Sequence, residues 1–197
     1  MNLFLWGALP YIAFTFLIVG TLVRFFYFER NWTTKSSEFL EKKQLRIANP
    51  LFHFGLLCVI GGHVVGVLIP KTWTAAIGIN DHMYHQGALY MGAVAGIIFI
   101  VGFLLLMKRR FTVPAMKVNT SGLDKWLYLF LTLAIFSGMA GTLLNASGFF
   151  DYRVSIGPWF RSLIFFMPDP SLMEGVPFMF KFHMLAWMVV AIIFPFS

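Results

Sequence analysis

The chain alternates between long apolar segments and short polar connections, a pattern typical of helices that cross a membrane. A spanning helix needs roughly 20 apolar residues, and five segments reach that length: Leu3 to Phe28, Ile47 to Ile69, Tyr84 to Met107, Trp126 to Ala146, and Val176 to Ser197. Backbone groups in lipid must find their hydrogen bonds within the segment. The pattern therefore predicts an all-α fold, an integral membrane five-helix bundle that forms one domain over residues 1–197.

Lysine and arginine gather in two of the four connections. The first connection carries Arg30, Lys35, Lys42, Lys43 and Arg46, and the third carries Lys108, Arg109, Arg110, Lys117 and Lys125. The connection at 70–83 has only Lys71. Because cytoplasmic loops are enriched in these residues, we expect the N-terminus outside and the C-terminus in the cytoplasm. Topology also accounts for the net charge of +7, so no nucleic-acid partner is expected.

The segment at 147–175 is long for a loop and amphipathic. It predicts a short helix in the outer interface before the last span, built around Trp159, Phe160, Leu163, Ile164 and Phe166. A re-entrant or disordered loop is the alternative. The first apolar segment lacks the basic start and small-residue cleavage site of a signal peptide, so we expect it to remain as a span.

Composition agrees with lipid as the solvent for much of the chain. Charged residues make up 12% of the sequence, against about 25% in soluble domains. The 24 phenylalanines and 11 methionines supply bulky, polarizable packing. The single cysteine, Cys58, excludes an intrachain disulfide and a cysteine-based metal site, and we expect it to be a small core residue.

Three histidines lie inside apolar segments, where an ionisable ring indicates a functional site. His53 and His63 are ten residues apart in the second span, and His183 lies in the fifth. His63 precedes Pro70 by seven residues and His183 follows Val176 by seven, so both lie roughly 10 Å below the outer boundary. Paired imidazoles on facing helices favour haem iron, and zinc lacks further ligands at that depth. Hydrogen-bonded packing or a proton path remains the alternative.

Two further features of the sequence bear on such a site. Gly55, Gly61, Gly62 and Gly66 lie in the same span as two of the histidines, and they predict either the approach of a large group or close helix packing. At the start of the third span, Tyr84 and His85 are candidates for a quinol pocket, since histidine can accept a quinol proton near neutral pH. His82 is expected to be a surface residue.

Several motifs then resemble one family, the gamma subunit (cytochrome b subunit) of respiratory nitrate reductase. In chain order they are Asn49-Pro50-Leu51-Phe52-His53-Phe54-Gly55, Gly62-His63-Val64-Val65-Gly66, Lys108-Arg109-Arg110, Thr120-Ser121-Gly122-Leu123-Asp124, Phe180-Lys181-Phe182-His183 and Phe194-Pro195-Phe196-Ser197. The resemblance covers the whole chain and implies two b haems stacked across the membrane. It implies that His63 and His183 ligate the outer, distal haem.

The resemblance also implies that His53 is one ligand of the inner, proximal haem, and that the second ligand comes shortly after Phe-Pro-Phe-Ser. That position lies beyond Ser197, so the C-terminal end is expected to be truncated. Quinol would dock near Gly62, His63, Tyr84 and His85. A lysine that lies near the quinol pocket in some members has no clear counterpart here.

In such a complex, electrons pass inward to an iron–sulfur beta subunit and a molybdenum-containing alpha subunit on the cytoplasmic side of a bacterial or archaeal membrane. The chain itself then supplies electron transfer and no nitrate chemistry. Two alternatives stay open at this point. One is the cytochrome b subunit of another quinone-linked oxidoreductase, such as formate dehydrogenase or hydrogenase, and the other is a haem-free membrane transporter or scaffold.

Overall fold

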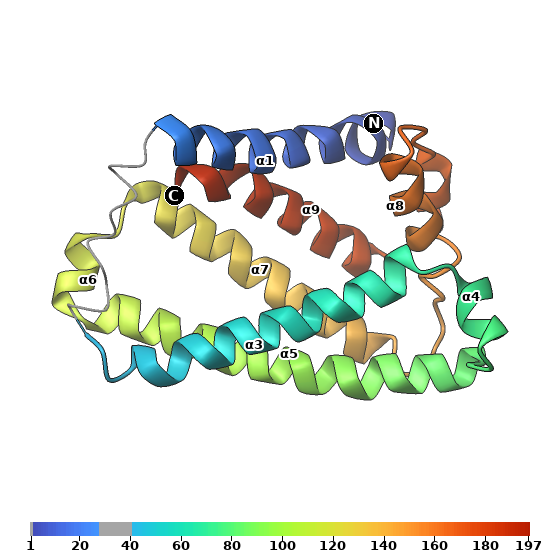
Figure 1. Ribbon diagram of the computed structural model, residues 1–197, viewed down its shortest axis with the longest axis horizontal. Coiled ribbons are helices and arrows are strands. Elements are labelled where there is room, and N and C mark those ends of the chain that lie inside the picture. The colour runs from blue at the N-terminus through green and yellow to red at the C-terminus, as the bar shows by residue number, and fades with distance from the viewer. Residues whose placement is uncertain (1, 28–40) are drawn as a thin grey trace.

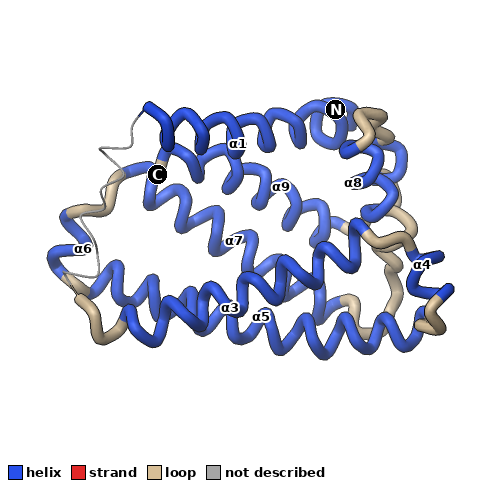
Figure 2. Tube along the Cα trace, viewed as in Figure 1, coloured by secondary structure: helices blue, strands red, loops and turns tan. Residues whose placement is uncertain are grey.

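A computed structural model describes residues 2–27 and 41–197, and these ranges fold into helices, turns and loops without a strand (Figures 1 and 2). Among them, five helices are long and apolar enough to cross a membrane. They are Phe4–Tyr27 (η1, Phe4–Ala8, then α1, Leu9–Tyr27), Leu45–Leu68 (α3, Leu45–His63, then η3, Val64–Leu68), Asp81–Thr112 (α5), Gly122–Leu144 (α7) and Phe178–Phe196 (α9, Phe178–Ile193, then η5, Phe194–Phe196). The predicted five-span, all-α fold is confirmed. Phe28, Arg30 and Lys35 lie outside the described residues.

Short helices join the spans at both ends of the bundle (Figure 1). Near the N-terminus lie α4 (Lys71–Ala76), α8 (Ile156–Ile164) and η4 (Pro170–Met173), and we call this the α8 end. At the opposite end, which we call the α6 end, α6 (Pro114–Val118) joins α5 to α7. Helix α3 packs chiefly against α5, whereas α9 packs against α7 and α1. The spans therefore follow the spatial order α3, α5, α7, α9, α1.

The third span is longer than its apolar stretch predicts. Helix α5 begins where the Asn80 side chain accepts a hydrogen bond from the Met83 N–H at 2.9 Å, an N-cap that satisfies one of the free amides. The helix continues through Lys108, Arg109 and Arg110 and ends before Pro114, which cannot continue it. Hydropathy marks only the apolar part, and the polar residues at each end add about two turns in total.

Two glycines let α3 and α5 approach closely. A Cβ on Gly55 would lie 2.5 Å from the Phe99 backbone nitrogen, and one on Gly102 would lie 2.3 Å from the Phe52 nitrogen. Gly55 thus serves close helix packing, one of the two alternatives that the sequence left open. Gly66 contacts tyrosine rings instead, and Gly61 and Gly62 have no described atom within 4 Å of a Cβ position.

One core prediction is wrong. Cys58 is exposed on α3 instead of lying in the core, because the contacts of this helix run mainly through its α5-facing side. An apolar side chain needs no protein neighbour where lipid is the solvent. Exposure within the bundle therefore says nothing about contact with water at this position.

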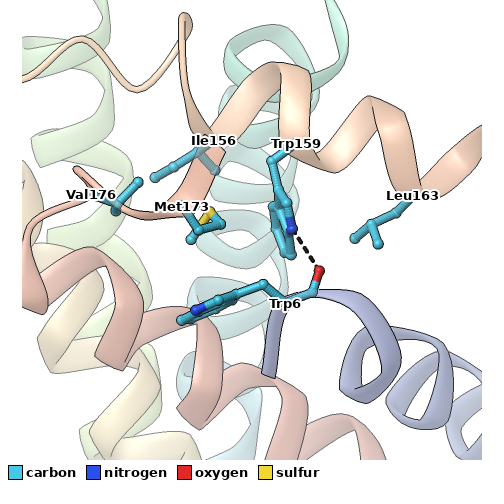
Figure 3. Close-up of a cluster of buried hydrophobic side chains, with 6 residues drawn as sticks. All are labelled: Trp6, Ile156, Trp159, Leu163, Met173 and Val176. Atoms are coloured by element: carbon cyan, nitrogen blue, oxygen red, sulfur yellow. Dashed lines mark hydrogen bonds between the residues drawn. The ribbon is translucent and has the colours of Figure 1, made fainter. Parts of the chain in front are cut away.

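A cluster of buried side chains closes the α8 end (Figure 3). The Trp159 Nε1–H donates to the Trp6 carbonyl oxygen at 2.8 Å, and the two rings meet edge to face with centroids 5.9 Å apart. The short helix predicted before the last span is present as α8. Its residues Trp159 and Leu163 pack against protein, and the exposed apolar residues are those that follow, at 164–167. Phe166 lies beyond the helix, with a φ of 57°.

Candidate functional site

The imidazole rings of His63 and His183 lie against each other near the α8 end. Their centroids are 6.0 Å apart and their planes differ by 26°. His63 is the last residue of α3, and His183 lies in the first half of α9, which runs in the opposite direction. The two helices pack chiefly on other helices and not on each other. Their histidines nevertheless meet, although they are 120 residues apart in the chain, in agreement with the matched depth expected from the sequence.

Hydrogen bonds to backbone carbonyls set the same tautomer in both rings. His63 Nδ1 lies 2.7 Å from the Val59 carbonyl oxygen, and His183 Nδ1 lies 2.8 Å from that of Ala134 on α7. A carbonyl oxygen can only accept, so each Nδ1 carries the proton and each Nε2 carries a lone pair. This is the arrangement by which proteins orient metal-binding histidines and raise their basicity.

Helix α7 also fixes the position of the His183 ring. A Cβ on Gly138 would lie 2.8 Å from His183 Cε1 and 3.1 Å from Nδ1, so only glycine leaves room for this ring. The Ser137 hydroxyl lies 3.4 Å from the same Nδ1. The sequence alone does not point to Ser137 and Gly138 as neighbours of His183. Two small residues in succession indicate room beside the helix, but not which side chain occupies that room.

The donor set fits an iron held between two imidazoles. When two imidazoles bind one metal through bonds of about 2 Å, their ring centres lie roughly 6 Å apart. The ring centroids of His63 and His183 are 6.0 Å apart. The described residues contain no group of three or more His, Cys, Asp or Glu side chains that suits a metal ion. Two imidazoles suffice for haem, whose porphyrin supplies the remaining ligands.

His53 lies ten residues before His63 on the exposed side of α3. Its Nδ1 is 2.9 Å from the Asn49 carbonyl oxygen, so Nε2 again carries the lone pair. Its ring meets Phe52 edge to face, with centroids 5.2 Å apart. The four other histidines of the chain lie further toward the α8 end, and none of them pairs with His53. A second proximal ligand beyond Ser197 stays a prediction.

The candidate quinol residues separate in the structure. The Tyr84 hydroxyl lies 3.2 Å from the Cβ position of Gly66, so Tyr84 packs beside the end of the second span. His85 instead points toward the turn that follows α7, where its Nε2 lies 3.1 Å from the Ala146 carbonyl oxygen. His82 is exposed in the first turn of α5, as expected. Gly62 faces no described atom within 4 Å of its Cβ position.

Two residues that the sequence did not single out surround Tyr84. The Arg153 guanidinium lies over the Tyr84 ring, with Cζ 3.7 Å from the ring centroid, and its Nη2 donates to the Thr74 hydroxyl at 2.7 Å. Burial raises the pKa of the neighbouring Tyr152 phenol, so this ring stays neutral. Both residues come from the long connection before α8, and only tertiary contacts bring them to the third span.

Comparison with known proteins identifies the family. The family model described as nitrate reductase gamma subunit matches residues 2–197. The chain is 47% identical over 194 residues to the nitrate reductase gamma chain of Bacillus subtilis, which covers 98% of this chain and 87% of that one. It is 28% identical to the respiratory nitrate reductase 1 gamma chain of Escherichia coli, over all of this chain and 88% of the relative. It is also 37% identical to the nitrate reductase-like protein NarX of Mycobacterium tuberculosis, of which it spans only 30%. The chain belongs to the nitrate reductase gamma subunit family.

Proposed function

We propose that this chain is the membrane cytochrome b subunit of a respiratory nitrate reductase, which oxidises quinol and relays the electrons through b haem to partner subunits. The observation that carries the proposal is the pair His63 and His183, whose rings lie 6.0 Å apart and both present an Nε2 lone pair. When bound, the haem supplies reversible one-electron transfer, and the protein supplies ligation and electrostatics.

Each ring is held for this role by a different part of the bundle. His63 is oriented by a carbonyl of its own helix, at Val59. His183 is oriented by the Ala134 carbonyl of α7 and fits against Gly138. His53 has the same tautomer as both, which supports its role as a ligand of a second, proximal haem.

The charge distribution supports an orientation with the α8 end outside. Arg109, Arg110, Lys117 and Lys125 lie at the α6 end, which therefore faces the cytoplasm by the positive-inside rule. The iron–sulfur beta subunit and the molybdenum-containing alpha subunit would dock there. Electrons from quinol then travel from the α8 end to the α6 end, and protons from quinol are released outside.

His85 is suited to take one of those protons. Because Nε2–H donates to the Ala146 carbonyl oxygen at 3.1 Å, Nδ1 carries the lone pair. A neutral imidazole in this tautomer can accept a proton at Nδ1. Tyr84 lies at the other side of the same turn, next to Gly66, and its hydroxyl can hydrogen-bond a quinol ring oxygen. Gly62 and His63 belong to the proposed pocket on the side of Tyr84, whereas His85 lies on the side of Ala146.

The proposal is tested on the purified complex with all subunits. A quinol analogue should produce the absorption bands of reduced b haem, and added nitrate should reverse them. His85→Gln should slow reduction by quinol at least several-fold, while chemical reduction with dithionite and haem content stay unchanged. His82→Gln, an exposed neighbour, serves as the matched control. A purified complex without b haem, or with haem that nitrate does not reoxidise, contradicts the proposed function.

A further inference from the structure

Arg153 is a buried guanidinium that has no carboxylate partner for its side chain among the described residues. It is only 5% exposed, and Nη2 donates to the Thr74 hydroxyl. The nearby carboxylates pair with another cation, since Lys71 Nζ lies 2.8 Å from Asp81 and 3.1 Å from Asp151. From Arg153, Asp151 accepts a hydrogen bond of the backbone N–H alone, at 2.9 Å, and none from the side chain. Among the described residues, no carboxylate therefore makes direct contact with this guanidinium.

The hydrogen bonds around Arg153 are incomplete as well. Its Nε is buried and has no hydrogen-bond partner in the described part of the protein, and neither has the buried Oγ of Ser155. Burying a charge is costly unless it is paired and its donors are satisfied. The Tyr84 ring beneath the guanidinium attracts it through a cation–π contact, but a neutral ring does not cancel the charge. An anion at this position would satisfy both needs.

The contacts of Tyr84 place Arg153 just beyond His63. The Tyr84 hydroxyl lies 3.2 Å from the Cβ position of Gly66. Gly66 follows His63 by three residues, which is about 4.5 Å along a helix axis, in the direction of the α8 end. Arg153 thus lies on the polar side of the His63 and His183 pair, toward the membrane boundary.

The same end of the span receives a second guanidinium. Arg161 of α8 donates from Nη1 to the Val67 carbonyl oxygen at 2.7 Å, within η3. This stretch is a π-helix, a form that frequently occurs at functional sites. Of the two arginines, Arg161 therefore contacts the residues that follow His63 directly, and Arg153 is linked to them through Tyr84.

We propose that Arg153 is the counter-ion for the propionate carboxylates of the haem that His63 and His183 hold. The inference rests on the proposed function, because it requires that haem to be present. A guanidinium forms charge-assisted hydrogen bonds with a carboxylate. A fixed positive charge beside the haem also favours the reduced state, which carries one positive charge less. Arg153 is thus a positioning and potential-setting residue, while the histidines remain the ligands.

The test is an optical redox titration of the purified complex that resolves the b haems. The haem that disappears in His63→Ala identifies the one held by this pair. In Arg153→Gln, that haem should titrate at a lower potential than in the wild-type complex, and the other b haem should not move. Arg153→Lys keeps the charge and should restore most of the potential. Lys117→Gln removes the same charge at the α6 end and should leave this haem unchanged.

Each outcome separates this inference from the proposed function. A wild-type complex without b haem overturns both. If haem is present and Arg153→Gln titrates like the wild type, the inference is wrong while the proposed function stands. If Arg153→Gln fails to assemble, Thr74→Val decides, because it removes only the hydroxyl that holds the guanidinium. A lower potential of the same haem in Thr74→Val supports the inference, and an unchanged potential overturns it.

Discussion

Gly138 on α7 lies directly against the His183 ring on α9, and a methyl group at position 138 would approach His183 Cε1 to 2.8 Å. The ring cannot retreat freely, because its Nδ1–H donates to the Ala134 carbonyl oxygen at 2.8 Å on the same neighbouring helix. The fourth span thus acts as a template for a histidine of the fifth. It fixes the height and rotation of the imidazole.

The first prediction concerns this fit. Gly138→Ala should displace the His183 ring and cost about 1–3 kcal/mol of stability through overpacking. We expect the assembled complex to lose most of the haem held by His63 and His183, as measured by b-haem absorbance per chain. Gly87→Ala is the matched control, because no described atom lies within 4 Å of its Cβ position. Full haem content in the Gly138 variant would show that this space is not needed.

A second prediction concerns the contact between α3 and α5. Gly102→Ala would place a methyl group 2.3 Å from the Phe52 backbone nitrogen, which cannot move without displacing α3. We expect a loss of about 1–3 kcal/mol, measured as a lower midpoint of thermal unfolding in detergent. Gly92→Ala, which faces open space on the same helix, should be neutral or slightly stabilising. Equal midpoints for the two variants would contradict the close packing described.

The bond between Trp159 and Trp6 gives a third prediction. Trp159→Phe keeps most of the ring but removes the N–H that donates to the Trp6 carbonyl oxygen at 2.8 Å. Loss of one partner of a buried hydrogen bond costs about 1–3 kcal/mol, so we expect earlier proteolysis of the N-terminal span. Trp73→Phe, at an exposed site on α4, is the control. Equal protease resistance of the two variants would show that the hydrogen bond between Trp159 and Trp6 contributes little to the stability of the N-terminal span.

The fourth prediction is a pH dependence at the α8 end. Hydrogen bonds and attraction to Asp81 and Asp151 raise the pKa of Lys71 above its ordinary value. Its contribution to stability is therefore complete below the unfolded pKa of about 10.4 and is lost as the pH rises through the higher folded value. We expect the midpoint of thermal unfolding of the wild type, relative to Lys71→Gln, to fall above about pH 10. A difference that stays constant up to pH 12 would contradict the ion pairs.

The spans could be predicted from the sequence because membrane helices must be long and apolar, and their number and order are confirmed. Their ends could not, since capping by Asn80 and the polar turn through Arg110 carry no hydropathy signal. The pairing of His63 with His183 could be predicted because both residues lie seven positions from the outer ends of their spans. The sequence could not decide the role of Gly55, because a glycine beside a histidine has the same pattern whether it faces a ligand or the Phe99 backbone.

The remaining parts of the site depend on contacts between distant segments. Gly138 on α7 contacts His183 on the neighbouring helix α9, and no periodicity within α7 indicates which residue Gly138 contacts. Arg153 comes from a connection and reaches Tyr84 in another helix. A sequence shows that these residues exist and what chemistry they carry. The packing of α7, α8 and α9 decides which of them lie at the histidine pair.

The most direct test of the account is the b-haem content of three single-histidine variants of the purified complex, measured against wild type. His63→Ala and His183→Ala should lose the same haem, with identical changes in the reduced-minus-oxidised spectrum, because both imidazoles hold one iron. His82→Ala, in the exposed first turn of α5, should keep the full haem complement. Full haem content in either of the first two variants, or the loss of different haems, would contradict the shared ligation on which the account depends.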